Sequence, residues 1–314
     1  MKTILITAIA GDIAQSIALI VREIFPKWRI LGCDIHDRHG AELVVDEWFL
    51  APLANSPDYR LWLETLVSKE TIDLCVPMSE AELLLFAQAK ISRIGRAFLI
   101  MPNAHAIEVG GDKLATARFL ESIDCPIPWT IPAEDSNSGT PFPCIIKPRR
   151  SAGSKAVFVC NTLQEAQFYR ERCPESVLQE LLLPDDQEVT CAVYRTQAGR
   201  VGVLQLLRKL VGGFTGWARV IDDPEILKQC ERVADALGLQ GSINVQLRIT
   251  NQGPRIFEIN PRFSSTILIR HMMGFQDVVW ALREVMGMTV ELAAPPVGVT
   301  AVRMQGAGLL PVPD

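Results

Sequence analysis

The sequence predicts a fold of the α/β and α+β classes: a doubly wound N-terminal domain, followed by units that contain antiparallel strands. In the first third of the chain, short apolar runs alternate with helical patterns, which is typical of a parallel sheet covered by helices on both faces. Further on, residues 241–262 form two alternating arms around the turn 251–254, which is typical of an antiparallel hairpin. The length of 314 residues suffices for two or three units with cores of their own.

The N-terminal unit opens with the apolar run 2–8, a turn at Gly11 and a helical pattern at 13–25. We expect further strands at 29–33, 72–76 and 97–101, and helices at 58–68 and 79–89. Asp34 follows the second strand, where a dinucleotide-binding fold places its ribose-binding acid. Only Gly11 stands where that fold needs three glycines, so an NAD(P)-dependent dehydrogenase is the weaker alternative.

The composition indicates where in the cell the protein is expected and which classes of partner it is not expected to bind. A net charge of -5 and a pI near 5.5 give no reason to expect nucleic acid as a partner. The eight cysteines are scattered without a Cys-x-x-Cys pair, which favours reduced core residues. Neither a signal peptide nor an uncharged run of membrane-spanning length is visible. We therefore expect a cytoplasmic protein that binds neither nucleic acid nor membrane, with a homodimer as the default assembly.

Two lysines stand at positions that favour contact with phosphate. Lys113 lies in the first turn of a helix predicted at 114–123, directly after Asp112, its expected N-cap. A cation there opposes the helix dipole, so either a surface lysine or a phosphate contact explains it. Lys147 ends the apolar strand 144–147, where burial is costly unless an anion is near.

A loop of small residues follows that strand and contains Ser151, Gly153 and Ser154. Small residues allow backbone N–H groups to approach oxygens, as in nucleotide-binding loops. The pattern is not that of a P-loop, and a flexible basic hairpin loop is the alternative.

Polar side chains recur on the strands predicted at 177–182 and 188–194. They are Gln179, Glu180 and Glu188, with the apolar Leu181 directly after Glu180. The acids among them are able to accept hydrogen bonds from an adenine amino group and from ribose hydroxyls, although alone they would pass as surface acids. The next strand, 200–211, carries Lys209 beside Arg208, and a helix is expected from 223 to 237.

The hairpin separates an apolar face from a polar one. We expect the apolar face to be formed by Ile243, Val245, Leu247, Ile249, Phe257 and Ile259. The opposite face carries three oxygen donors of the kind that magnesium binds, followed by a guanidinium suited to phosphate oxygens. These residues are Gln246, Glu258, Asn260 and Arg262. A solvent-facing hairpin shows the same alternation, but this composition favours a site for a metal-bound polyphosphate.

Five further side chains lie where either a substrate or a structural partner explains them. They are Ser79, Glu80, Arg270, His271 and Arg303. A helix cap is the stronger interpretation for Ser79, and a helix histidine with a structural partner is the stronger one for His271.

Taken in order, these motifs resemble the ATP-grasp superfamily, and most of all the synthetase halves of carbamoyl phosphate synthetase large subunits. The strongest part is the stretch 241–246 followed by 258–264. The resemblance covers nearly the whole chain. It implies a Rossmann-like pre-ATP-grasp domain at 1–110, an N-terminal ATP-grasp lobe at 111–182 and a C-terminal lobe with the metal site at 183–314.

The resemblance also implies a role for each of these residues. Magnesium, or manganese as a substitute, would be held between ATP phosphates by Gln246, Glu258 and Asn260, and Arg262 would stabilise the transferred phosphoryl group. The residues that contact ATP would be Lys113, Lys147, Ser151, Gly153 and Ser154 at the phosphates, Gln179, Glu180 and Leu181 at the adenine hinge, and Glu188 at the ribose. Lys209 would be a further active-site cation.

The implied activity is that of an ATP-dependent ligase that joins a small carboxylate to an amine or a related nucleophile through an acyl phosphate. The chain has one ATP-grasp unit rather than two and ends at Asp314, so a single-unit carboxylate–amine ligase is expected rather than carbamoyl phosphate synthesis. A nucleotide-binding regulatory module without catalysis is the alternative from another class.

Overall fold

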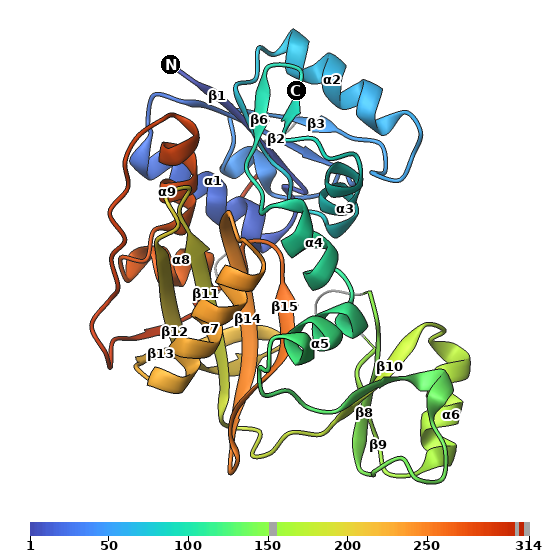
Figure 1. The fold of residues 1–314 in the computed structure, drawn as a ribbon. Helices are drawn as coiled ribbons and strands as arrows, with labels where there is room; N and C mark the ends of the chain where they lie inside the picture. Colours follow the sequence, from blue (N-terminus) through green and yellow to red (C-terminus); the bar gives the residue numbers. More distant parts are fainter. Residues whose placement is uncertain (151–155, 305–307, 311–314) are drawn as a thin grey trace.

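A computed structural model describes residues 1–150, 156–304 and 308–310, and in them the chain forms three sheets. Figure 1 shows the N-terminal domain at the top, the third sheet below it, and a small sheet with one helix at the lower right. Each sheet is confined to one of the ranges 1–110, 111–182 and 183–314, which we keep as the proposed domain boundaries.

The first sheet has the strand order β3-β2-β1-β4-β6-β5, parallel except for the edge strand β5. Its strands are β1 (Thr3–Thr7), β2 (Arg29–Asp34), β3 (Glu47–Leu50), β4 (Leu74–Val76), β5 (Arg93–Ile94) and β6 (Ala97–Leu99). The helices are α1 (Asp12–Ile24), α2 (Tyr59–Lys69) and α3 (Glu80–Gln88), with a 3-10 turn at Ala41–Leu43. The predicted doubly wound domain is confirmed, and Ser79 caps α3 together with Glu82.

The second sheet is antiparallel, with the order β7-β10-β8-β9. Its strands are β7 (Thr130–Pro132), β8 (Cys144–Pro148), β9 (Phe158–Cys160) and β10 (Ser176–Glu180). A 3-10 turn (Ala133–Asp135) and α6 (Leu163–Arg172) accompany it, and α4 (Ala104–Gly110) and α5 (Lys113–Ser122) precede it. These two helices connect the N-terminal domain to this small sheet (Figure 1).

The third sheet is antiparallel and has the order β15-β14-β11-β12-β13-β16. Its strands are β11 (Glu188–Arg195), β12 (Val201–Val211), β13 (Phe214–Ile221), β14 (Gly241–Thr250), β15 (Gly253–Asn260) and β16 (Thr300–Val302). Its helices are α7 (Pro224–Ala236), α8 (Ile267–Met272) and α9 (Asp277–Val285). The predicted hairpin is thus β14–β15, at the edge of this sheet.

One face of this sheet packs on α7. Ile243, Val245 and Leu247 of β14 are completely buried there, as the alternation predicts. In β15 the prediction is wrong for Phe257, because a β-bulge shifts the phase: Leu247 lies opposite Ile256, and Gln246 opposite Glu258. Ile256 therefore joins the core face, and Phe257 is the extra, half-buried residue.

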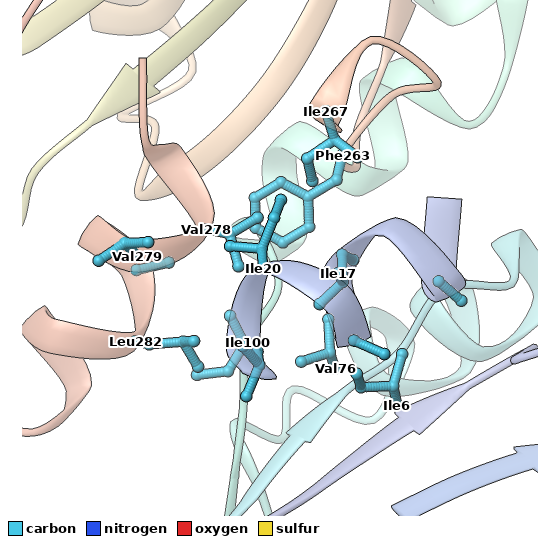
Figure 2. Packing of buried hydrophobic residues seen from close by; sticks show 14 of the residues in the cluster. Ile6, Ile17, Ile20, Val76, Ile100, Phe263, Ile267, Val278, Val279 and Leu282 are labelled. Atoms are coloured by element: carbon cyan, nitrogen blue, oxygen red, sulfur yellow. The ribbon is translucent and has the colours of Figure 1, made fainter. Parts of the chain in front are cut away.

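A shared core fixes the N-terminal domain to the third sheet. Figure 2 shows Ile20 of α1 beside Val278 of α9, and Ile17 of the same helix nearer to Val76 and Ile6 of the first sheet; all of them belong to one cluster with Val279 and Leu282. Phe263, the residue after Arg262, belongs to the same cluster and is 6% exposed. Burial of this ring anchors the chain at the position from which Arg262 projects.

Within the described residues, no helix combines the length and the apolar character needed to cross a membrane.

Candidate active site

The three predicted metal ligands lie on the face of the third sheet opposite α7. Gln246 and Glu258 are directly paired across β14 and β15, and Asn260 is paired with Asn244 two positions along the same face. Cross-strand partners have Cβ atoms only about 4.5–5.5 Å apart, so one ion is within reach of several of these oxygens. The register thus brings together donors that are 14 positions apart in the sequence.

Two lysines from outside this sheet approach Glu258. The Nζ atom of Lys113, in the first turn of α5, lies 3.2 Å from Glu258 Oε1. Lys147, at the end of β8, is 6% exposed, and its Nζ atom lies 5.6 Å from the centre of the Phe257 ring. Both predicted phosphate-binding lysines therefore face the end of β15 that carries the predicted metal ligands, from two different elements.

Local packing explains why α5 begins at this place. Asp112 caps the helix through the N–H groups of Leu114 and Ala115, and Arg149 donates two hydrogen bonds to its carboxylate. A Cβ atom on Gly110 would lie 2.8 Å from Pro261 Cδ, so the glycine permits close contact between α4 and the end of the hairpin. Gly110, three positions before Lys113, is thus explained by packing.

Burial lowers the pKa of Lys147 to about 8. The nearby Glu258 carboxylate raises the pKa of this amine, and the Lys113 ammonium lowers it, but the loss of hydration is the largest effect. A buried ammonium in this setting gains most from a further anion, such as a phosphate group.

We expect Lys147→Met to stabilise the ligand-free protein at pH 7 by about 3 kcal/mol, because a folded-state pKa near 8 lies below the ordinary value of 10.5. Below pH 8 the folded state must hold the unfavourable charge. The difference between the variant and the original chain should shrink as the pH rises from 8 to 10.5, where Lys147 is neutral in both states. Urea unfolding across this range measures it, and the exposed Lys69→Met is the control. A difference that is constant with pH would contradict the expectation.

Glu188, predicted at the ribose, is held by two arginines. Its carboxylate accepts hydrogen bonds from Arg208 at 2.6 Å and from Arg248 at 2.8 Å. Arg248 is the direct register partner of Glu188 on β14, and Arg208 reaches the same carboxylate from β12, so the three groups share the face of the predicted metal ligands. A ribose contact by Glu188 stays a prediction.

The structure does not bring Lys209 to this site. Lys209 is exposed and pairs with Trp217, while its neighbour Arg208 points to the opposite face of β12, where it contacts Glu188. Successive side chains of a strand alternate between faces, so only one of the two residues reaches the site. Arg208, and not Lys209, is the cation that β12 contributes.

The side chains of the predicted adenine hinge already have partners. Glu180 accepts hydrogen bonds from Arg255 and from the Trp129 N–H, and Gln179 donates to Thr130. Leu181 follows as the chain leaves β10 for the third sheet. Their side chains thus hold the hinge in place, and an adenine contact would fall to the backbone. Ser151, Gly153 and Ser154 lie outside the described residues.

Arg262 faces the N-terminal domain. Its guanidinium lies 3.7 Å from a carboxylate oxygen of Glu80, and it lines a cavity of about 280 Å³ together with Gly11, Asp12 and Ser79. This cavity lies at the carboxyl ends of β1 and β4, the edge at which doubly wound domains bind their ligands. Sequence reasoning named Ser79 and Glu80 but did not recognise Asp12.

The other three candidates have structural partners. Arg270 is completely buried and pairs with Asp277 at 2.6 Å, and His271 lies 3.5 Å from a carboxylate oxygen of Glu23. Arg303 lies 3.5 Å from Asp12 and donates a hydrogen bond to the Ser265 carbonyl. Arg303 therefore contacts a residue of the Arg262 cavity, Asp12, whereas Arg270 and His271 do not line this cavity.

The donor set fits a magnesium ion that arrives with a nucleotide. Within the described residues there is no cluster of three or more His, Cys, Asp or Glu side chains suited to a metal. Glu258 is the single carboxylate of the predicted set, and one carboxylate plus substrate phosphates is a common way of binding Mg²⁺. The buried amide nitrogen of Asn244 has no hydrogen-bond partner among the described residues, and its oxygen accepts from Thr190. Sequence reasoning placed Asn244 on the polar face without assigning it to the site.

Comparisons with known proteins agree with this geometry. Residues 172–306 match a family described as "ATP-grasp in the biosynthetic pathway with Ter operon". A D-alanine–D-alanine ligase from Thermotoga petrophila is 37% identical over 93 residues, which is 28% of this chain and 30% of that protein. A formate-dependent phosphoribosylglycinamide formyltransferase from Wolinella succinogenes is 24% identical over 284 residues, covering 79% of this chain and 68% of that protein.

Solved structures extend the likeness to almost the whole chain. N5-carboxyaminoimidazole synthetase from Staphylococcus aureus, complexed with ADP, matches with a TM-score of 0.76 at 18% identity, covering 94% of this chain and 80% of that one. At this identity the match shows a shared fold. The D-alanine–D-alanine ligase match spans less than a third of that protein. Neither this match nor the structural one therefore identifies the substrate of this chain.

Proposed function

Because this chain is a member of the ATP-grasp superfamily, we propose that it is an ATP-dependent carboxylate–amine ligase that acts through an acyl phosphate. The observation that carries the proposal is the convergence of Gln246, Glu258 and Asn260 with Lys113 and Lys147 on one face of the third sheet. The narrower likeness to carbamoyl phosphate synthetase halves stays a prediction.

The reaction has two steps. A carboxylate oxygen attacks the γ-phosphorus of ATP, the bond to the β–γ bridging oxygen breaks, and ADP leaves. An amine then attacks the acyl carbon, the bond between that carbon and the phosphate oxygen breaks, and phosphate leaves. The nitrogen gives up a proton as the new C–N bond becomes an amide. The first step is needed because a carboxylate is a poor electrophile at neutral pH.

The residues of the chain supply alignment and charge. Lys113 and Lys147 would hold phosphate oxygens, and Gln246, Glu258 and Asn260 would hold Mg²⁺, with Mn²⁺ as a substitute. When bound, the ion neutralises charge on the phosphates. Arg262 lies between this face and the cavity beside Asp12 and Glu80, so we assign it to the substrate carboxylate and to the phosphoryl group.

The experiment is ADP release from Mg-ATP across pools of carboxylates and amines. We expect turnover with at least one pair, and about a 100-fold loss of kcat/KM in Arg262→Gln, because a donor that acts on the transferring group is removed. The exposed Arg60→Gln, which removes a guanidinium from a surface pair with Glu64, should match the original chain. Mg-ATP binding without turnover of any pair would instead favour the regulatory module.

A dehydrogenase finds no support in the geometry. The Asp34 carboxylate, the expected ribose ligand in that case, accepts hydrogen bonds from the Ala10 and His36 N–H groups. No observation in the described residues favours this alternative over the ligase.

A further inference from the structure

A second cavity adjoins the one that Arg262 lines. It has a volume of about 260 Å³ and lies beyond the carboxyl ends of β1, β2 and β3. Ala8 and Ser79 line both cavities, so the second cavity lies directly beside the one at Arg262.

The acidic groups of this second cavity are already occupied by the protein. Glu82 accepts hydrogen bonds from Thr7 at 2.7 Å, from Ser79 at 2.7 Å and from the Tyr59 hydroxyl. Asp34 accepts from two backbone N–H groups, at 2.9 and 3.0 Å. These carboxylates fix the loops around the cavity and have few free lone pairs for a ligand.

Apart from the polar side chain of Asn55 and the hydroxyl groups of Thr7, Ser79 and Tyr59, the rest of the wall is apolar. It includes Ile35, Ala51, Pro52, Leu53 and Ala54, which come from the segments that follow β2 and β3. Ile35 is 45% exposed and Leu53 is 57% exposed, although both border a cavity. An apolar group in the cavity would remove their surfaces from water, which is favourable by about 25 cal/mol for each Å².

We propose that the substrate whose carboxylate faces Arg262 has an apolar body, and that this second cavity holds it. The proposal rests on the function proposed above and adds to it the class of acid that the enzyme activates: an aliphatic or aromatic acid rather than a dicarboxylate or a sugar acid. Arg262 would position the reacting end, and Ile35 and Leu53 would select the other end.

The test uses hydroxylamine as the nucleophile, because it converts an acyl phosphate to a hydroxamate and the natural amine need not be known. The acids are acetate, butyrate and hexanoate, with adipate as the charged counterpart of hexanoate. We expect kcat/KM to rise about fourfold for each methylene group until the cavity is full. Adipate should fall at least about tenfold below hexanoate, because its second carboxylate would be desolvated without a partner.

Variants of the cavity wall test whether the preference for hexanoate arises in the second cavity. Leu53→Asp should lower the ratio of kcat/KM for hexanoate to kcat/KM for acetate at least about tenfold, and Ile35→Asp is a second variant with the same expectation. Leu61→Asp is the control, since Leu61 is 68% exposed on α2 and lines neither cavity. Equal values for hexanoate and adipate, or an unchanged hexanoate value in both cavity variants, would overturn the inference.

Mg-ATP binding, measured separately by calorimetry, keeps the two proposals apart. If the protein binds Mg-ATP and activates only charged acids, the ligase function is supported and the proposed apolar pocket is refuted. A chain that binds Mg-ATP should also bind hexanoate in the presence of a non-hydrolysable ATP analogue, and absence of that binding would likewise refute the pocket. If the protein activates no acid at all but binds hexanoate more tightly than adipate, the proposed ligase function is refuted and the apolar pocket is supported.

Discussion

Glu258→Gln is expected to lower Mg-dependent ADP formation at least about 1,000-fold. Glu258 is the single carboxylate of the predicted ligand set, and its loss removes the anion that would bind the metal together with the ATP phosphates. A glutamine keeps the size and one oxygen of the side chain, so the sheet register should survive.

The same substitution separates metal binding from nucleotide binding. Glu258 also neutralises Lys113, at 3.2 Å, and raises the pKa of Lys147. Without it, the positive charge of Lys113 and Lys147 is less compensated, so we expect metal-free ATP to bind at least as tightly as before while its response to Mg²⁺ disappears.

Calorimetry with ATP, in Mg²⁺ and in EDTA, measures this, alongside ADP release. Glu64→Gln is the matched control, because Glu64 forms an exposed pair with Arg60 on α2. A Glu258→Gln variant with an undiminished Mg²⁺ response would show that the metal is held elsewhere.

Asp277→Ala is expected to destabilise the protein by about 3–5 kcal/mol, a large share of a typical stability of 5–15 kcal/mol. Arg270 is completely buried, and Asp277 is its carboxylate partner, at 2.6 and 2.9 Å. Removal of the acid leaves an uncompensated buried charge. The Ser242 hydroxyl, which donates to Asp277 at 2.6 Å, loses its acceptor as well.

This buried pair also supports the site. Arg270 donates hydrogen bonds to Ser264 and Thr266, in the segment that directly follows Arg262 and Phe263. The network therefore fixes the chain between β15 and α8, and its loss should reduce kcat in any variant that still folds.

Urea unfolding measures the change in stability. Asp235→Ala is the control: Asp235 pairs with Arg195 at 3.5 Å but is 69% exposed, so its loss should cost less than about 1 kcal/mol. The double variant Arg270→Met with Asp277→Leu removes both charges and should recover most of the loss. Equal effects of the buried and the exposed substitution would contradict the argument.

The local sequence pattern was sufficient for most of the fold. Apolar runs and helix caps predict the doubly wound domain, because backbone hydrogen bonding and burial act over a few residues. The regular alternation of β14 likewise puts Gln246 on the polar face and Ile243 in the core. Alternation cannot reveal a bulge, however, because the extra residue is defined by the partner strand, and this is why Phe257 was misplaced.

The sequence by itself determined which residues are predicted to carry the chemistry, since donor type and spacing along one strand are local properties: Glu258, Asn260 and Arg262 were proposed in this way. Only the tertiary structure decided which cations meet them. Lys113 and Lys147 come from separate elements, and Arg208 rather than Lys209 lies on this face because the side chains of β12 alternate. Asp12 lines the same cavity as Arg262, although the two are 250 positions apart in the sequence. Contacts between such distant residues depend on packing between domains, which no short stretch of sequence encodes.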